Sequence, residues 1–321
     1  MKTKRRAALI ALGLCAGLIG AGPRPSRQQD AKQDVQKQDA SADISVIAIT
    51  IAVTVKTNGG RYINDLAEKD FAVFENNRKR PLTYFRHDSE APVSLTILLD
   101  VSGSMAVQDK LAEIKACFRP FLFSVLKPRD EVSLLIFADG AVEVAARHTT
   151  AKDALWAILE KADAFGKTAL NDAVGVSPEF ANKGRHEKRA LLLLTDGVEN
   201  DSQYSADKAL EVARRVDVPI YTIGYKIPLD EDALRKLKKT PGATPSGIAA
   251  SLERFSLATG GKAFFLRSPE EVTAALREIK DELSRQYIIG FTSYKNVSDE
   301  YRHIRVTTPK KNLRVRTRQG Y

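Results

Sequence analysis

Cysteine and histidine are scarce in this chain of 321 residues, which contains two cysteines and four histidines. Cys15 lies in an apolar N-terminal segment, so Cys117 would be the only cysteine left if that segment were removed, and no internal disulfide is expected. Cys117 stands within a helical pattern and is expected to be a small buried apolar residue. The scattered histidines form no HExxH motif and no Ser-His-Asp order, which argues against zinc proteases and serine hydrolases.

Long apolar runs are also lacking, apart from residues 7–21. That run follows a basic start and ends in small residues, and it is short for a membrane span. We therefore expect a signal peptide over residues 1–22, no stable membrane span after its cleavage, and an exported protein that is periplasmic, extracellular or envelope-associated. An uncleaved anchor and lipidation at Cys15 are the alternatives, although Leu14 is bulky where a small residue should precede a lipidated cysteine.

The largest segment lacks an excess of charge of either sign. The net charge is +10, but residues 93–285 carry 27 basic and 28 acidic side chains. The excess lies in residues 1–25, with five basic and no acidic residues, and in residues 286–321, with eight basic and two acidic residues. A nucleic-acid-binding protein would carry a basic face on its main domain, so nucleic acid is not an expected partner.

Two β-rich segments flank the centre of the chain. Residues 23–42 are polar and low in complexity, which predicts a disordered linker. Residues 43–90 alternate in a strand-like way and predict a small antiparallel β unit, in which 71–75 and 82–87 form two strands joined at an Asn-rich turn. Residues 286–321 show the same rhythm, and their packing with residues 43–90 is a hypothesis. The alternation favours a solvated sheet face for the tail's arginines over a site for an anionic partner.

The centre alternates apolar strands with helical patterns. This order predicts an α/β fold with a doubly wound, Rossmann-like and mostly parallel sheet, flanked by the small antiparallel β unit. An Asp-Gly turn after the second strand predicts a hairpin and one antiparallel edge strand. The expected strands cover residues 93–99, 131–137, 189–195, 218–224 and 262–266, and the expected helices cover 107–126, 151–162, 170–182, 204–216, 248–259 and 269–284.

Side-chain oxygens follow two of these strands. Asp100 ends the first strand and is followed by Ser102 and Ser104, Asp196 comes directly after another strand, and Thr168 lies in a Gly-containing loop before a helix. In doubly wound sheets, ligands bind beyond the carboxyl ends of the strands. Two carboxylates and three hydroxyls are hard oxygen ligands that suit Mg²⁺ or Mn²⁺, whereas Zn²⁺ is disfavoured because no histidine or cysteine is near.

Three short motifs in the chain resemble those of a known domain family. "DVSGSM" at 100–105, "KTAL" around Thr168 and "TDG" at 195–197 together resemble the von Willebrand factor A domain and its complete metal-ion-dependent adhesion site, over residues 91–285. The resemblance implies that Ser102 and Ser104 bind the metal directly, that Thr168 joins directly or through water, and that Asp100 and Asp196 neutralise and orient it. The flanking segments further resemble secreted bacterial proteins with a related domain, known especially from acidobacteria.

Structural alternatives exist for each part of the motif. Ser102 or Ser104 could cap the helix that follows, Thr168 could cap the helix at 170, and Asp196 could belong to an Asx turn. The sequence favours a binding module without enzymatic activity, which would coordinate a carboxylate of an unknown protein partner through Mg²⁺ or Mn²⁺. The alternatives are a structural envelope or assembly protein with a non-essential metal site, and a metal-assisted hydrolase.

Overall fold

The computed structural model describes residues 45–197, 199–227, 247–295 and 300–321. The signal peptide expected over residues 1–22, with Cys15, and the linker expected over residues 23–42 lie outside this range. Within it, Cys117 is a buried free cysteine, as predicted. No helix among the described residues combines the length and the apolar character needed to cross a membrane.

A six-stranded sheet forms the centre of the fold, in the order β10-β9-β8-β5-β6-β7. All its pairings are parallel except that of β7 with β6, which makes β7 the antiparallel edge strand expected from the sequence. The Asp139-Gly140 turn joins these two strands, and both residues have positive φ, at 48° and 70°. The strands are β5 (Val93–Asp100), β6 (Glu131–Ala138), β7 (Ala141–Thr149), β8 (Lys188–Thr195), β9 (Ile220–Tyr225) and β10 (Ala263–Leu266).

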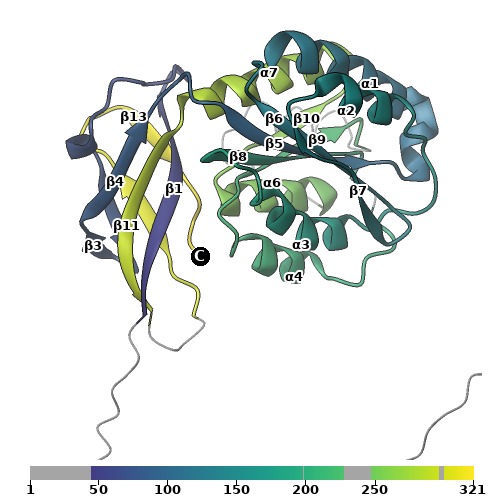
Figure 1. The fold of residues 1–321 in the computed structure, drawn as a ribbon. Helices are drawn as coiled ribbons and strands as arrows, with labels where there is room; N and C mark the ends of the chain where they lie inside the picture. The colour runs from purple at the N-terminus through teal and green to yellow at the C-terminus, as the bar shows by residue number, and fades with distance from the viewer. Residues whose placement is uncertain (1–44, 198, 228–246, 296–299) are drawn as a thin grey trace, which may run out of the picture. The chain divides into compact units, whose positions relative to one another are not determined.

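Helices cover both faces of this sheet, as Figure 1 shows. One apolar cluster packs α1 (Lys110–Pro120), α2 (Lys152–Glu160) and α7 (Pro269–Arg285) on one face. A second cluster packs the other face against a further set of helices, which are α3 (Leu170–Ala181), α4 (Ala206–Ala213) and α6 (Gly247–Thr259). The central strands are buried on both sides, which explains their almost continuous apolar sequence.

The single helix predicted over residues 107–126 is wrong at both ends. A 3₁₀ segment over Gly103–Asp109, which is kinked at Val107 and Gln108, precedes α1. Gln108 and Asp109 have left-handed backbones with φ of 57° and 53°, so the α-helix cannot extend back through them. A π-helical turn over Phe121–Val125 follows α1, directly after Pro120. Proline lacks the N–H that a continuous α-helix needs, so the hydrogen-bond ladder changes there.

The flanking segments form two antiparallel sheets, in the orders β13-β1-β11-β4 and β12-β2-β3. The long strand β1 (Ser45–Thr57) pairs with β11 (Tyr287–Lys295) and with β13 (Leu313–Arg316). The other strands are β2 (Ala72–Glu75), β3 (Arg78–Arg80), β4 (Leu82–His87) and β12 (Ile304–Thr307), and a 3₁₀ turn covers Glu68–Asp70. Both ends of the described chain therefore contribute strands to one sheet.

The hairpin predicted between residues 71–75 and 82–87 is wrong. Asn76 and Asn77 adopt left-handed backbones, with φ of 44° and 62°, and return the chain into the short strand β3, which pairs with β2. Strand β4 joins the other sheet and pairs with β11. The Asn-rich turn was correctly placed, but the three residues of β3 are too few to give a sequence pattern.

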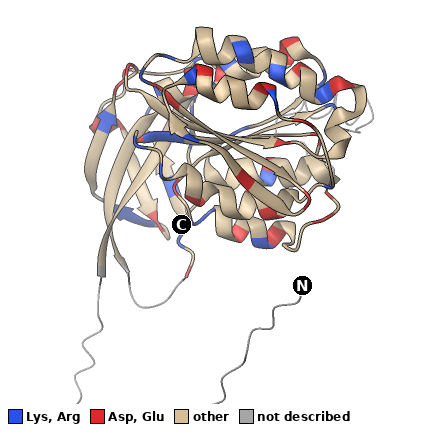
Figure 2. Ribbon diagram, turned by 45° about the vertical axis from the view of Figure 1, so that its right-hand side comes forward, with Lys and Arg blue, Asp and Glu red and all other residues tan. Residues whose placement is uncertain are grey.

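The prediction that the tail's arginines lie on a solvated sheet face is wrong for several of them. Arg302 pairs with the buried Glu75, Arg316 with the buried Glu282, and Arg318 is 6% exposed. Arg305, by contrast, is exposed and lies over the ring of Phe74. Figure 2 shows that basic and acidic residues are mixed along the helices of the α/β part.

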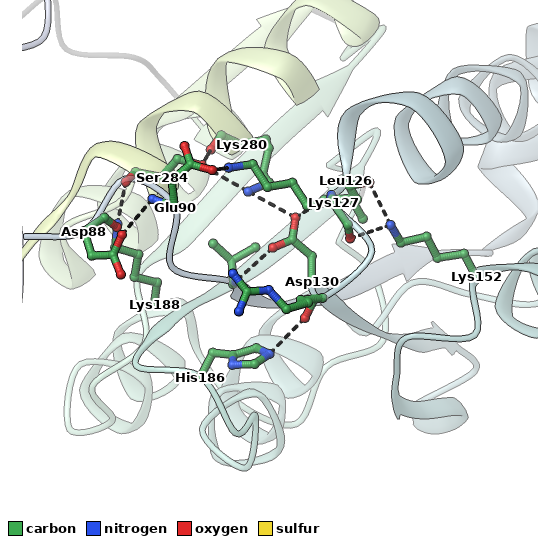
Figure 3. Close-up of polar contacts among 12 residues, drawn as sticks. Asp88, Glu90, Leu126, Lys127, Asp130, Lys152, His186, Lys188, Lys280 and Ser284 are labelled. Atoms are coloured by element: carbon green, nitrogen blue, oxygen red, sulfur yellow. Dashed lines mark hydrogen bonds and ion pairs between the residues drawn. The ribbon is translucent and has the colours of Figure 1, made fainter.

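A buried ionic cluster lies at the amino-terminal edge of the central sheet (Figure 3). Asp130 is fully buried and accepts hydrogen bonds from the backbone N–H groups of Val93 and Lys127, and it pairs with Lys280 at 3.1 Å. Lys188 is 3% exposed and donates to the carbonyl oxygens of Asp88 and Ser284. The cluster therefore ties the segment that leads into β5 to the end of α7.

Lys188 is expected to make stability rise between pH 8 and pH 10. Burial, reinforced by neighbouring cations, lowers the pKa of Lys188 to about 8 from 10.5. In this pH range the unfolded chain binds more protons than the folded one, so the free energy of unfolding increases with pH, by about 2 to 3 kcal/mol for this group. Urea unfolding at pH 8 and pH 10 tests this. Lys188→Met should lose the increase, whereas Lys183→Met at an exposed position should keep it; equal slopes in all three proteins would contradict it.

Candidate metal site

The candidate site lies where the strand order of the central sheet reverses. The chain runs from β5 outward to β6 and β7 on one side, and then to β8, β9 and β10 on the other (Figure 1). Asp100 is the last residue of β5, and Asp196 follows directly after the adjacent parallel strand β8. Both carboxylates therefore lie at the carboxyl edge of neighbouring strands, at the switch point where α/β sheets bind ligands.

Asp100 is fully buried at this edge. Its Oδ1 accepts the backbone N–H of Ser102 at 2.9 Å, and its Oδ2 accepts the hydroxyl of Thr195 at 2.6 Å. Burial raises the pKa of Asp100 to about 6, and the negative charge of Asp196 adds to the increase. The two carboxylates thus interact with each other, and two hydrogen bonds do not fully offset the desolvation of Asp100.

The two serines turn their hydroxyls toward each other. Ser102 is fully buried, and its Oγ lies 3.1 Å from the Oγ of Ser104. Ser102 precedes the 3₁₀ segment, but its side chain forms no capping hydrogen bond with that segment. The alternative that Ser102 serves as a helix cap therefore lacks its defining contact.

Thr168 is 1% exposed and lies just before α3. The residue at the capping position of α3 is Ala169, so Thr168 does not occupy it. Its backbone N–H donates to Oδ1 of Asn200 at 2.9 Å, which ties it to the loop after β8. Two residues earlier, the carbonyl of Gly166 accepts the N–H of Gly103 at 2.9 Å. The Thr168 loop is therefore held between the loops that carry the two carboxylates.

Asp196 is fully buried, and its Oδ2 lies 2.8 Å from the Nζ of Lys110. The N–H of Gly197 donates to the hydroxyl of Thr195. Sequence reasoning missed both Lys110 and Thr195. Thr195 could have been found from its place directly before Asp196. For Lys110, the only signal in the sequence is its place at the start of a helical pattern.

The donor set fits a hard divalent cation. The parts of the chain that the structure describes contain no group of three or more histidine, cysteine, aspartate or glutamate side chains placed to hold a metal. The candidate site instead combines two buried carboxylates with hydroxyls, and the raised pKa of Asp100 marks a carboxylate whose charge lacks sufficient compensation. Oxygen donors of this kind suit Mg²⁺ or Mn²⁺.

The sequence model of the von Willebrand factor type A domain matches residues 94–260, which is more than half of the chain and includes all five predicted site residues. The chain belongs to the von Willebrand factor type A (VWA) domain family. The predicted α/β fold with its mostly parallel sheet is thereby confirmed. VWA domains typically mediate interactions between proteins, and most serve adhesion or assembly.

Sequence relatives of this VWA protein are distant. An uncharacterized protein of Synechocystis is 26% identical over 212 residues, which cover 64% of this chain and 44% of that protein. An uncharacterized protein of Borreliella burgdorferi is 26% identical over 142 residues, which cover 42% of this chain and 41% of that protein. The chain thus spans less than half the length of these curated relatives.

Solved structures of VWA proteins are similar at low identity. A von Willebrand factor type A structure from Catenulispora acidiphila is 12% identical, with a TM-score of 0.49, and covers 77% of this chain and 71% of that chain. Proximal thread matrix protein 1 from the mussel byssus, in a structure with a zinc-occupied MIDAS motif, is 16% identical, with a TM-score of 0.48. It covers 66% of this chain and 50% of that chain.

Proposed function

We propose that this VWA protein is an exported module that binds an acidic group of a protein partner through Mg²⁺ or Mn²⁺. The observation that carries the proposal is the convergence of two fully buried carboxylates, Asp100 and Asp196, at the carboxyl edge of adjacent strands. Export is inferred from the sequence of residues 1–22. Adhesion or assembly in the cell envelope is the setting that fits such a module.

In the proposed site, Ser102, Ser104 and Thr168 would hold the cation through their hydroxyl oxygens. Asp100 and Asp196 would balance its charge and orient the ligands. A bound divalent cation supplies a Lewis-acidic centre that accepts a carboxylate oxygen of the partner. The Asp100 carboxylate is oriented in advance by Ser102 and Thr195, so little rearrangement is needed on its side.

A metal-assisted hydrolase would need a general base near the metal, and the sequence offers Asp139 and Asp172 for that role. Both carboxylates are engaged in structural contacts. Asp139 accepts the N–H of Lys167 at 2.7 Å and lies beneath Gly166, where a Cβ would come within 2.2 Å of its side chain. Asp172 accepts the N–H groups of Gln203 and Tyr204. These contacts favour a role in shaping loops over that of a general base, which would have to reach a proton of the substrate.

Peptide selection tests the proposed partner chemistry. Random peptides displayed on phage are selected on the immobilised protein in Mg²⁺ and in EDTA, with Ser104→Ala as a counter-selection target. We expect peptides enriched only in Mg²⁺ and only on the wild type to share an aspartate or glutamate, because a carboxylate completes the coordination. Enrichment that does not depend on Mg²⁺, or Mg²⁺-dependent peptides without a shared acidic residue, would contradict the proposal.

A further inference from the structure

A lysine lies within the candidate metal site. Lys110 is only 8% exposed, and its Nζ is 2.8 Å from Oδ2 of Asp196 and 3.4 Å from the carbonyl oxygen of Ser104. It therefore contacts one of the carboxylates assigned to the metal and the backbone of a residue whose hydroxyl is assigned to it. An ammonium at this place changes the charge that any bound cation experiences.

The backbone fixes Lys110 in this position. Gln108 and Asp109 both adopt left-handed conformations, which are unfavourable for residues other than glycine, and α1 begins at the next residue. Leu111 and Ile114 then anchor the first turns of α1 in the apolar core. The side chain of Lys110 is thus directed toward the site by a defined turn rather than reaching it from a mobile surface position.

We propose that Lys110 is a fixed counter-charge that makes metal binding at this site depend on an acidic partner; this inference rests on the function proposed above. Asp100 and Asp196 alone would balance a divalent cation. Lys110 cancels one of the two negative charges, so the site with its metal retains one positive charge. A carboxylate from the partner restores the balance.

Burial strengthens the effect of the remaining positive charge on metal binding. Asp100 and Asp196 are both fully buried, and charges in such surroundings are screened much less than at the surface. An uncompensated positive charge therefore weakens metal binding when no partner is present. With an anionic ligand in place the same charge strengthens the complex, so Lys110 determines the preference for acidic over neutral ligands.

Mn²⁺ titrations of the full protein, followed by the EPR signal of free Mn²⁺, test this role. Acetate serves as the carboxylate probe, and acetamide is its neutral match. Lys110→Gln removes the charge and keeps a hydrogen-bond donor for Asp196, whereas Lys110→Arg keeps the charge. Lys115→Gln is the matched control on the same helix, because Lys115 contacts the carbonyl oxygens of Glu160 and Ala162 instead.

We expect acetate, but not acetamide, to raise the Mn²⁺ affinity of the wild type, Lys110→Arg and Lys115→Gln. Lys110→Gln should bind Mn²⁺ roughly tenfold more tightly without acetate and gain little from acetate. An unchanged or lower affinity in Lys110→Gln, with wild-type binding intact, would overturn the role of Lys110 and leave the metal site standing. Binding that persists in Lys110→Gln combined with Asp100→Ala, or no binding in any variant, would overturn the proposed site as well.

Discussion

Replacing Glu282 with glutamine is expected to lower the free energy of unfolding by about 3 to 5 kcal/mol. Glu282 lies on α7 and is 1% exposed, and it accepts the hydroxyl of Tyr221 at 2.6 Å. It also pairs with Lys56 of β1, at 3.4 Å, and with Arg316 of β13. Neutralising Glu282 leaves these two cations without their buried counter-charge, and the loss should appear as a lower urea midpoint.

Glu278 provides the control for this prediction. It lies one turn earlier on α7 and pairs with Lys56 at 3.4 Å and with Lys262 at 2.6 Å, but its side chain is 36% exposed. Glu278→Gln should therefore change the free energy of unfolding by less than about 1 kcal/mol. If Glu278→Gln and Glu282→Gln destabilise the protein equally, Glu282 does not fasten α7 to the flanking sheet as described.

Asp100→Asn is expected to be more stable than the wild type in EDTA and less stable in saturating Mn²⁺. Burial raises the pKa of Asp100 to about 6 from 3.8, so the stabilisation this group provides is present at low pH and is lost as the pH rises through 6. At pH 7 the ionised carboxylate then costs about 3 kcal/mol without metal, and asparagine avoids that cost. A metal at 1,000 times its dissociation constant returns about 4.1 kcal/mol, but only to the wild type, and this gain exceeds the cost of the ionised carboxylate.

Urea unfolding at pH 7 and pH 5, with Mn²⁺ and with EDTA, measures this reversal in the order of stability between Asp100→Asn and the wild type. The advantage of Asp100→Asn in EDTA should shrink at pH 5, where the wild-type carboxyl is largely protonated. Asp172→Asn is a useful comparison, because Asp172 accepts the backbone N–H groups of Gln203 and Tyr204 and is not one of the proposed metal ligands. An Asp100→Asn variant that is less stable than the wild type under every condition would show that Asp100 serves the fold alone.

Much of the α/β part could be predicted because its patterns are long. Strands β5 and β8 are eight residues each, and β5 is buried throughout while β8 is buried at every position except Arg189, so their apolar runs are visible in the sequence. The β3 strand has three residues and left no pattern, and the partner of β4 is β11, some 200 residues away. The inward pairing of Arg316 likewise depends on Glu282 of a distant helix, which periodicity cannot reveal.

The five proposed oxygen donors could be selected from the sequence because each stands at a strand end or in an adjacent loop, and strand ends converge in a parallel sheet. Lys110 could not, because a lysine at the start of a helix is ordinarily solvated. Its approach to Asp196 depends on the left-handed turn at Gln108 and Asp109, residues with no strong preference for that conformation in isolation.

Calorimetric titration of Mn²⁺ into the wild-type protein and into Asp100→Ala tests the central claim most directly. Asp100 is the carboxylate that ends β5, and it forms hydrogen bonds with Ser102 and Thr195. We predict saturable one-to-one binding by the wild type and an affinity at least about 100-fold lower in the variant. Equal affinities in the two proteins, or no binding by the wild type with acetate present, would contradict a divalent-metal site at the carboxyl edge of β5 and β8.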